Sequence, residues 1–360
     1  MYVFDNLLKK VVVFASLLIF LNFFVWNNLV FNFVLVVTAF CLTDFVFHVV
    51  WHFVTKEMLP DLNDKAVFIT GCDSGFGHKL AMKLDKLGVT VFAGCLFPEG
   101  DGASQLKKSC SDRLNIIQLD VMKQEHVDKA AEIVTSTLQN RSEKLWAVVN
   151  NAGIASGSEV EWTPMEEYDR IIGVNATGPA MVTKAFLPLL RKSKGRVVIV
   201  TSILGRTTFP GLSAYCMSKY AAVALSNALR REVLKWSISV HTIQPWFYST
   251  NITDGKTVAR DIKRNWDKAP QSVRDDYEEG YINKYMKLGS RTMELISRPE
   301  SAVYEVVDAL AHAAIGKNPK LHYVPGIIGY IQTKICAAMS DEVVDMLSLI
   351  AEKIPADKKT

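Results

Sequence analysis

The sequence TGCDSGFG, from Thr70 to Gly77, decides the fold of this chain. It follows the apolar run KAVFIT (65–70) and opens a helical segment, roughly 76–88. Parallel α/β sheets bind the pyrophosphate of a dinucleotide at such a turn, because backbone amides of the helix N-terminus approach the phosphates there. The spacing is G-x3-G-x-G, and no GK[ST] follows, so the turn is not a P-loop. The loop residues predicted to contact the cofactor are Gly71, Ser74, Gly75, Phe76 and Gly77.

From Lys65 onward, short apolar runs alternate with longer helical stretches. This alternation predicts a parallel sheet with helices on both faces, because each strand connects to the next through a helix. We therefore predict an α/β fold of the Rossmann type, a doubly wound parallel sheet of about seven strands. After residues 65–70, strands are expected at VTVFAGCL (89–96), LNIIQL (114–119), LWAVVN (145–150), RVVIVTS (196–202) and ISVHTI (238–243).

The composition excludes several classes of function. The chain has 360 residues, 49% of them hydrophobic, and a net charge of +4. No block of Lys and Arg stands out, so no nucleic-acid partner is expected. None of the six cysteines has CxxC spacing, which excludes a zinc ribbon and a thioredoxin-type motif. No His/Cys cluster has ligand spacing, so the predicted chemistry uses no metal.

Residues 11–54 are nearly continuous apolar chain. Residues 11–26 and 29–43 carry no charge, and a further apolar run covers residues 45–54. A membrane-spanning helix needs ~20 residues, whereas the apolar core of a cleaved signal peptide has only ~7–15. The pattern therefore favours a permanent N-terminal transmembrane anchor over residues 1–55, with one or two hydrophobic segments.

The orientation of the anchor stays open. Lys9 and Lys10 favour a cytosolic N-terminus. Two spans would leave the remainder of the chain in the cytosol, and one span would place it in the lumen. After the anchor we expect a Rossmann domain over residues 56–330 and a C-terminal extension over residues 331–360.

A second motif points to acid–base chemistry. Tyr215 and Lys219 lie four residues apart in YCMSK, so a helix would place them on one face. A neighbouring ammonium lowers the pKa of a Tyr hydroxyl and makes it usable as a general base. Such pairs are also common on protein surfaces, but Ser202 ends a predicted strand, where a side chain faces the ligand crevice. Asn175, in GVNATG, stands in a helical segment where Asn is locally unfavourable.

These motifs make the chain resemble the short-chain dehydrogenase/reductase superfamily. TGCDSGFG, NNAG (Asn150 to Gly153), the Asn175 position, Ser202 and YCMSK occur in the order of that family. VFAGCL, SDRL, LDV, FLPLLRKSKGRVV and LRRE are similar to its membrane-associated branch of retinol, 17β-/11β-hydroxysteroid and D-β-hydroxybutyrate dehydrogenases. The resemblance covers residues 63–330. It implies an NAD(P)-dependent alcohol dehydrogenase, which we expect in the endoplasmic reticulum membrane or, as the alternative, in a mitochondrial membrane.

The resemblance also implies residue roles. Tyr215 would take the proton of the alcohol, and Lys219 would lower the pKa of Tyr215 and bind the nicotinamide ribose. Ser202 would hydrogen-bond the reacting oxygen, and Asn175 would hold a water in a proton relay. Asp120 would bind the adenine amino group, although an Asp there could also cap the next helix. The other residues expected to bind the cofactor are Asn151, Ala152, Gly153, Tyr215 and Thr250.

The end of the second predicted strand bears on the choice of cofactor. A carboxylate there would bind the ribose hydroxyls of NAD, but positions 95–97 hold none. No Arg or Lys occurs at residues 93–101 or 72–76, so a 2′-phosphate would lack a counter-ion. The sequence therefore favours NAD over NADP.

One position departs from the family pattern. After Pro245 the family has Gly, but this chain has Trp246, which we expect to crowd the cofactor or cover the substrate. A catalytically weak, NAD-binding membrane protein is therefore one alternative function.

The substrate is predicted from the anchor and from the expected lid, residues 250–295. The anchor favours a lipophilic alcohol, a steroid or a retinoid, and the resemblance to hydroxybutyrate dehydrogenase leaves a small 3-hydroxy acid as the alternative. A homo-oligomer is also expected from the family. The lid mixes many charges with the apolar side chains Ile262, Trp266, Tyr277, Tyr281 and Tyr285.

Overall fold

The computed structural model describes residues 31–39, 43, 57–278 and 280–351. The chain forms two compact units, one containing Lys56–Thr333 and the other containing Lys334–Lys353. Most of the predicted anchor lies outside the described residues. Within the described ranges, no helix is both long enough and apolar enough to span a bilayer.

A parallel sheet of seven strands forms the centre of the larger unit, in the order β3-β2-β1-β4-β5-β6-β7. The Rossmann-type α/β fold predicted from the sequence is thereby confirmed. Six strands lie where apolar runs predicted them, whereas the seventh has only two residues and no such run. The strands are β1 Lys65–Thr70, β2 Thr90–Cys95, β3 Leu114–Gln118, β4 Lys144–Asn150, β5 Arg196–Val200, β6 Ser239–Ile243 and β7 His322–Tyr323.

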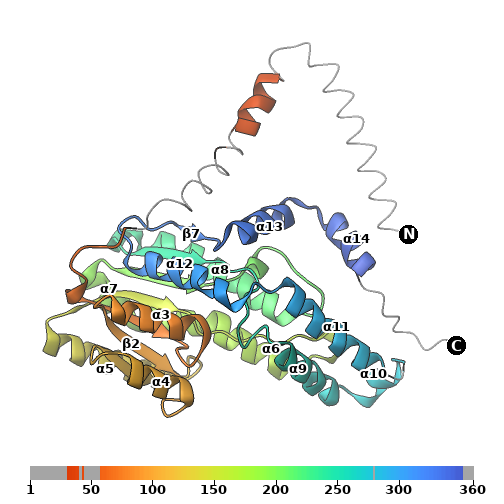
Figure 1. The fold of residues 1–360 in the computed structure, drawn as a ribbon, viewed down its shortest axis with the longest axis horizontal. Coiled ribbons are helices and arrows are strands. Elements are labelled where there is room, and N and C mark those ends of the chain that lie inside the picture. Colours follow the sequence, from red (N-terminus) through yellow and green to blue (C-terminus); the bar gives the residue numbers. More distant parts are fainter. Residues whose placement is uncertain (1–30, 40–42, 44–56, 279, 352–360) are drawn as a thin grey trace. The chain divides into compact units, whose positions relative to one another are not determined.

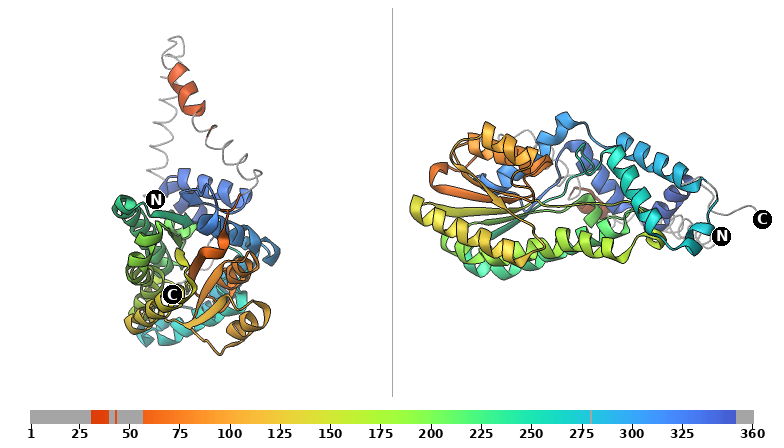
Figure 2. Two further views of the ribbon diagram at one scale, coloured as in Figure 1. Left: turned by 90° about the vertical axis from the view of Figure 1, so that its left-hand side faces the viewer. Right: turned by 90° about the horizontal axis from the view of Figure 1, so that it is seen from below.

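Helices cover both faces of the sheet (Figures 1 and 2). The side chains of β1 show why: Val67 and Ile69 pack into the core under α3, α4 and α12, while Phe68 packs into the core under α5, α7 and α8. This alternation is the period of two expected of a strand. The Phe68 ring lies 4.3 Å from that of Phe186 on α7. The helices are α3 Gly75–Lys86, α4 Asp101–Ser109, α5 Gln124–Arg141, α7 Gly178–Ser193, α8 Ser213–Val233 and α12 Val303–Ile315.

The chain order reverses beside β1, which pairs with β2 on one side and with β4 on the other. Loops that leave β1 and β4 at their carboxyl ends therefore diverge to opposite faces, and a crevice opens between them. The glycine-rich loop follows β1, Asp120 follows β3, NNAG follows from the end of β4, Ser202 follows β5 and Thr250 follows β6. Asn175 and the YCMSK motif lie in helical segments.

The helices α9, α10 and α11 lie between β6 and α12 in the chain and gather at one end of the larger unit (Figure 1). They form their own small core around the buried Trp162. Short helices and a π-helix complete the described fold. These elements are α6 Met165–Ile172, η3 (the π-helix) Gly173–Thr177, α9 Gly255–Lys268, α10 Gln271–Asp275, α11 Tyr281–Ile296, α13 Ile327–Ala338 and α14 Asp341–Ala351.

Candidate active site

The glycine-rich loop has the geometry that its sequence requires. Gly71 and Gly75 have positive φ angles of 71° and 63°, a backbone region that L side chains rarely adopt. A Cβ at Gly77 would lie 2.4 Å from Asn151 Nδ2 and from Gly71 O. No side chain caps the start of α3, so the first amides of this helix can donate to a phosphate.

The loop is fastened to the end of β4 through Thr70. Its Oγ1 accepts hydrogen bonds from Asn151 N (3.0 Å) and Ala152 N (2.9 Å). Asn151 Nδ2 donates in turn to Thr70 O (2.9 Å) and Gly71 O (3.0 Å). The Asn151 side chain thus holds two strand ends together. The sequence analysis did not identify this role of Thr70, although its signal is a hydroxyl at the end of the first strand.

A cleft of about 600 Å³ lies along these strand ends. The glycine-rich loop and the uncapped start of α3 form one wall, where backbone amides can meet a pyrophosphate. The residues present therefore fit a dinucleotide. Five predicted site residues do not line the cleft: Gly77, Asn175, Ser202, Tyr215 and Lys219. Gly77 provides space beneath the loop, Asn175 is buried behind it, and Ser202, Tyr215 and Lys219 line an adjoining pocket. The predicted residues that do line it are Gly71, Ser74, Gly75, Phe76, Asp120, Asn151, Ala152, Gly153 and Thr250.

Two carboxylates in the cleft are tied to the backbone. Asp120 Oδ1 accepts from Met122 N at 3.0 Å, which holds the turn before α5. Asp73, in the glycine-rich loop, accepts from Leu96 N and Phe97 N, both at 2.9 Å. The structure therefore brings a carboxylate to the end of β2, where the local sequence has none.

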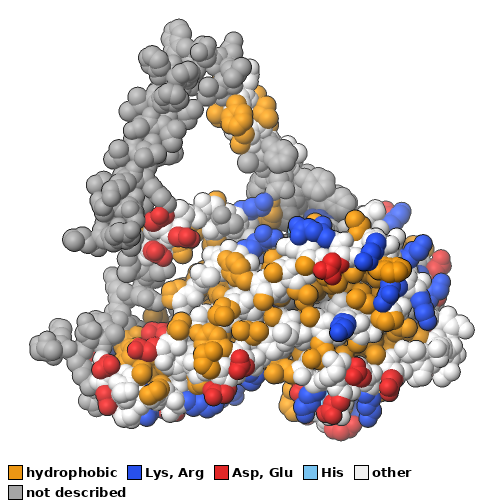
Figure 3. Space-filling model, turned by 180° about the vertical axis from the view of Figure 1, so that it is seen from behind, with side chains coloured by type: hydrophobic (Ala, Val, Ile, Leu, Met, Phe, Trp, Pro, Cys, Tyr) orange, Lys and Arg blue, Asp and Glu red, His pale blue; other side chains and the backbone are white. Residues whose placement is uncertain are grey.

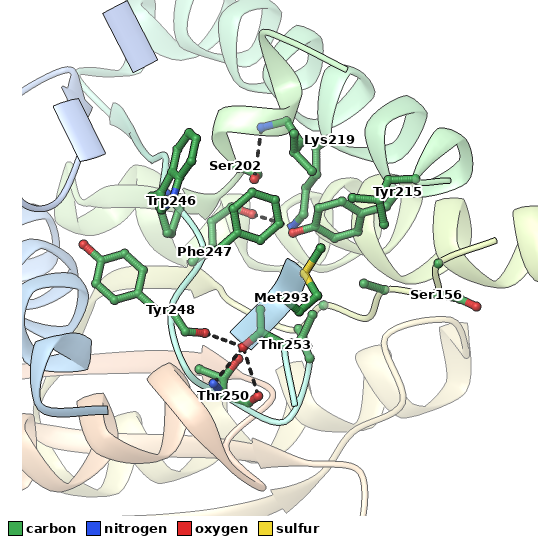
Figure 4. Close-up of a pocket in the computed structure, with 18 of the residues that line it drawn as sticks. Ser156, Ser202, Tyr215, Lys219, Trp246, Phe247, Tyr248, Thr250, Thr253 and Met293 are labelled. Carbon is green, nitrogen blue, oxygen red and sulfur yellow. Dashed lines mark hydrogen bonds between the residues drawn. The ribbon is translucent and has the colours of Figure 1, made fainter. Parts of the chain in front are cut away.

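Ser202, Tyr215 and Lys219 meet at the adjoining end of the cleft (Figure 4). Ser202 follows β5, and its Oγ accepts from Leu204 N at 3.1 Å. Tyr215 and Lys219 come from successive turns of α8, and Lys219 Nζ lies 5.5 Å from the centroid of the Tyr215 ring. Lys219 Nζ also donates to Val200 O at 3.1 Å. Three of the four residues predicted to be catalytic thus share one site, and the fourth, Asn175, lies behind it.

Burial controls the protonation of this pair. It raises the pKa of Tyr215 to about 12, and the hydrogen bond with Ser202 acts in the opposite direction. Burial lowers the pKa of Lys219 to about 8. The predicted lowering of the Tyr215 pKa is therefore wrong for this structure, because loss of hydration outweighs the effect of the Ser202 hydrogen bond. At pH 7 the phenol is neutral, and the ammonium keeps its charge beside it.

Asn175 lies in the π-helix between α6 and α7, where π-type turns commonly mark functional sites. Its Oδ1 accepts from Ile154 N (2.9 Å), and its Nδ2 donates to Ile154 O (2.8 Å) and Ser218 Oγ (2.9 Å). Ser218 Oγ donates to Tyr215 O at 2.7 Å. The Asn175 side chain is thus fully used in linking the loop after β4 to the helix of the YCMSK motif.

A pocket of about 120 Å³ adjoins the Tyr215 side chain. Lys219 and Asp261 are the charged residues among its described lining. Phe247 and Met293 lie beside the catalytic residues (Figure 4). The apolar side chains that line the pocket are Phe76, Ala155, Val200, Leu204, Leu212, Pro245, Trp246, Phe247, Ile252, Val258 and Met293.

Trp246 does not occupy the cofactor cleft. Its Nε1 donates to Ile296 O at 3.1 Å, at the end of α11, and its ring packs edge-on against Phe247. The indole lines the substrate pocket but is absent from the walls of the 600 Å³ cleft. The position gives no support to crowding of the cofactor, and cover over the substrate stays a prediction.

The lid aromatics pack against one another more than into the pocket. The centroid of the Trp162 ring lies between 4.9 and 6.2 Å from the ring centroids of Trp266, Tyr277, Tyr281 and Tyr285. None of these five residues lines the pocket. They form a small core that joins the predicted lid to Trp162, which the sequence did not show because Trp162 precedes the lid by almost a hundred residues.

Charged side chains hold the lid helix α9 against α6. Glu167 accepts from Arg170 (2.6 Å) and from Arg264 (3.0 Å), and Arg264 also donates to Asp261 (2.9 Å). Glu167 and Asp261 are buried. Because removal of one partner would leave a buried charge unpaired, this chain of ion pairs fixes where α9 crosses the cleft.

Comparisons with known proteins agree with this geometry. The family model described as short chain dehydrogenase matches residues 65–261. Estradiol 17-beta-dehydrogenase 2 of Mus musculus is 41% identical over 298 residues, which are 81% of this chain and 75% of the relative. Retinol dehydrogenase 5 of Mus musculus is 36% identical over 279 residues, 77% and 85% of the two chains. Mitochondrial D-beta-hydroxybutyrate dehydrogenase of Bos taurus is 39% identical over 269 residues, 73% and 77%.

A solved structure gives the same fold. A short chain dehydrogenase from Burkholderia cenocepacia J2315, in complex with NADP, superposes with a TM-score of 0.57 at 21% identity and covers 79% of this chain and 97% of its own. The family match and the three relatives, taken with the cleft and the Ser202–Tyr215–Lys219 arrangement, lead to one conclusion. The chain belongs to the short chain dehydrogenase family and is an oxidoreductase that acts on CH–OH groups with a nicotinamide cofactor.

Proposed function

We propose that this protein is a membrane-anchored, NAD-dependent dehydrogenase that interconverts a hydroxyl and a carbonyl on a lipophilic substrate, a steroid or a retinoid. The observation that carries the proposal is the apolar lining of the pocket beside Tyr215. Two relatives act, by their names, on estradiol and retinol. The apolar N-terminal sequence supports delivery of the substrate from a membrane, with the endoplasmic reticulum as the proposed location.

In the proposed mechanism Tyr215 accepts the proton of the substrate alcohol. Ser202 donates a hydrogen bond to the substrate oxygen, and the Lys219 ammonium stabilises the phenolate that forms. Such stabilisation is needed because burial raises the pKa of Tyr215 to about 12. Bound nicotinamide supplies the hydride acceptor. Gly71, Gly75 and the first turn of α3 would hold its pyrophosphate, and Thr250 lies near the proposed nicotinamide end of the cleft.

The charges around the pocket disfavour the alternative substrate. A 3-hydroxy acid carries a carboxylate, which needs a cationic or multiply hydrogen-bonding partner. Among the described residues lining the pocket, the one cation is Lys219, which belongs to the catalytic set, and Asp261 adds a negative charge. We therefore place the small hydroxy acid second, although a relative is named for that activity.

A substrate panel tests the proposal directly. With membrane-reconstituted protein and NAD⁺, we expect kcat/KM for a hydroxysteroid or retinol to exceed that for 3-hydroxybutyrate by about 100-fold, because the acid would leave a carboxylate unpaired. NADH formation is the measurement, and the methyl ester of 3-hydroxybutyrate is the matched control, since it removes only the charge. Faster turnover of the free acid than of every lipophilic alcohol would contradict the proposal.

The pH dependence tests the acid–base assignment. Alcohol oxidation requires the basic form of Tyr215 and the charged form of Lys219, so its kcat/KM is expected to rise with pH up to about 8, the pKa of Lys219. Because the Ser202 hydrogen bond lowers the pKa of Tyr215, Ser202→Ala is expected to move this rising limb to higher pH. The measurement is the pH profile of kcat/KM for both proteins. Thr201→Val is the control, since its hydroxyl bonds Ile243 O, and an unmoved limb in Ser202→Ala would refute the assignment.

We also propose that the chain forms a homo-oligomer. The face seen in Figure 3 carries apolar side chains among its charges. On α8, Met217 is 53% exposed and Tyr220 is 43% exposed. A second copy of the chain would remove such surface from water.

A further inference from the structure

Asp73 lies where a cofactor-selecting residue would be expected. Its two carboxylate oxygens accept hydrogen bonds of 2.9 Å from Leu96 N and Phe97 N, the first residues after β2. In dinucleotide-binding sheets, a carboxylate at the end of the second strand binds the adenosine ribose hydroxyls of NAD. Here the end of β2 has no carboxylate of its own, and Asp73 reaches it from the glycine-rich loop.

The backbone fixes Asp73 in this position. Cys72 N donates to Gly94 O at 2.9 Å, which joins the loop to β2. On the other side, a Cβ at Gly102 would lie only 1.9 Å from Asp73 O, so the first turn of α4 packs directly on the Asp73 peptide. The Asp73 backbone therefore lies in a closely packed junction of β1, β2 and α4. Two backbone amides after β2 hold its carboxylate in place.

Asp73 lies on the wall of the cofactor cleft. Asp73, Ser74, Leu96 and Asp120 all line the 600 Å³ cleft. Each carboxylate oxygen already accepts one backbone amide and keeps a second lone pair for a hydroxyl. A pair of ribose hydroxyls can donate to these lone pairs, whereas a 2′-phosphate in the same place would meet a like charge.

No cation in the described part of the chain offsets Asp73 on this side of the cleft. Lys107 lies near the loop after β2, but its Nζ is engaged by Glu99 Oε1 (3.3 Å) and Pro98 O (3.4 Å). Lys107 also does not line the cleft. Three arginines line it, all from α6 and α9 on the other wall: Arg170 and Arg264 are paired with Glu167, and Arg260 lies on α9 beside Asp261.

We propose that Asp73 selects NAD over NADP by accepting the adenosine ribose hydroxyls and repelling a 2′-phosphate. The proposal rests on the nicotinamide cofactor of the proposed function and names the residue that discriminates between its two forms. Tertiary structure, and not the residue at the strand end itself, supplies the acidic group.

The test measures binding, not turnover. The dissociation constants of NAD⁺ and NADP⁺ are determined by isothermal titration calorimetry for the full-length protein and for Asp73→Asn, Asp73→Ser and Asp120→Asn. For both Asp73 variants we expect the ratio of the NADP⁺ constant to the NAD⁺ constant to fall by about 30-fold or more, since a like-charge contact is removed. Asp120→Asn is expected to change the binding of both dinucleotides alike and so to keep the ratio, because the adenine that Asp120 is predicted to bind is common to NAD⁺ and NADP⁺.

Binding of 5′-AMP and 2′,5′-ADP is measured on the same proteins to isolate the adenosine end. The variants are expected to gain affinity for 2′,5′-ADP and to gain none for 5′-AMP. A ratio within threefold of the unaltered protein in both Asp73 variants, with unchanged thermal unfolding, would overturn the role of Asp73 alone. Failure of the unaltered protein to bind either dinucleotide would overturn the proposed function as well.

Discussion

Tyr215→Phe is expected to lower kcat for alcohol oxidation by roughly 10³-fold, within the ~10²–10⁴ range of general acid–base catalysis. The substitution removes one oxygen, the proposed proton acceptor, and leaves the ring that packs beside Phe247 and Leu212. Because Tyr215 lines the substrate pocket and not the 600 Å³ cleft, the dissociation constant of NAD⁺ should change by less than about twofold. Single-turnover NADH formation and a separate NAD⁺ titration give the two quantities.

The matched control is Tyr220→Phe on the same helix, outside both cavities. It loses the same atom and is expected to keep full activity. Equal turnover of Tyr215→Phe and Tyr220→Phe would show that the general base is another group. A parallel loss of NAD⁺ binding in Tyr215→Phe would indicate that the phenol holds the cofactor instead of acting on the alcohol.

Gly77→Ala is expected to weaken NAD⁺ binding by more than about tenfold and to lower the unfolding temperature by about 3–10 °C. The added Cβ would lie 2.4 Å from Asn151 Nδ2 and from Gly71 O. One of these groups must shift, and both belong to the hydrogen bonds that join the glycine-rich loop to the end of β4. Thermal unfolding without cofactor and titration with NAD⁺ measure the two effects separately.

Gly157→Ala is the control for this substitution. A Cβ there meets its nearest neighbours, Gly211 O and Leu212 Cδ2, at 3.6 Å, an ordinary contact distance. The position does not line the cofactor cleft, so neither stability nor NAD⁺ affinity should change appreciably. If Gly77→Ala behaved like this control, the close fit between loop and strand end would not be what shapes the cofactor site.

The fold was largely predictable because its signals are local. Apolar runs long enough to be buried on both faces marked six strands, and the glycines of TGCDSGFG marked the turn after β1. β7 escaped prediction, since a strand of two residues leaves no pattern and exists only because β6 offers it a partner. The predicted anchor stays a prediction, because it lies almost wholly outside the described residues.

The site was predictable only in part. Ser202, Tyr215 and Lys219 could be found because strand-end position and helical spacing are themselves sequence features. The direction of the Tyr215 pKa could not, since it depends on how much water surrounds the phenol. The position of the Trp246 ring could not be predicted either, because Ile296 O, which accepts the hydrogen bond of its indole N–H, is fifty residues away in the chain.

By itself, then, the sequence determined the order of strands and helices and which residue types stand at the strand ends, because these follow from periodicity over a few residues. Only the tertiary structure decided which of those groups meet. It carried the Asp73 carboxylate to the end of β2, joined Trp162 to the lid aromatics, and left Lys219 as the cation beside an apolar pocket. Such contacts link residues distant in the chain, and their energies depend on burial, which no local pattern specifies.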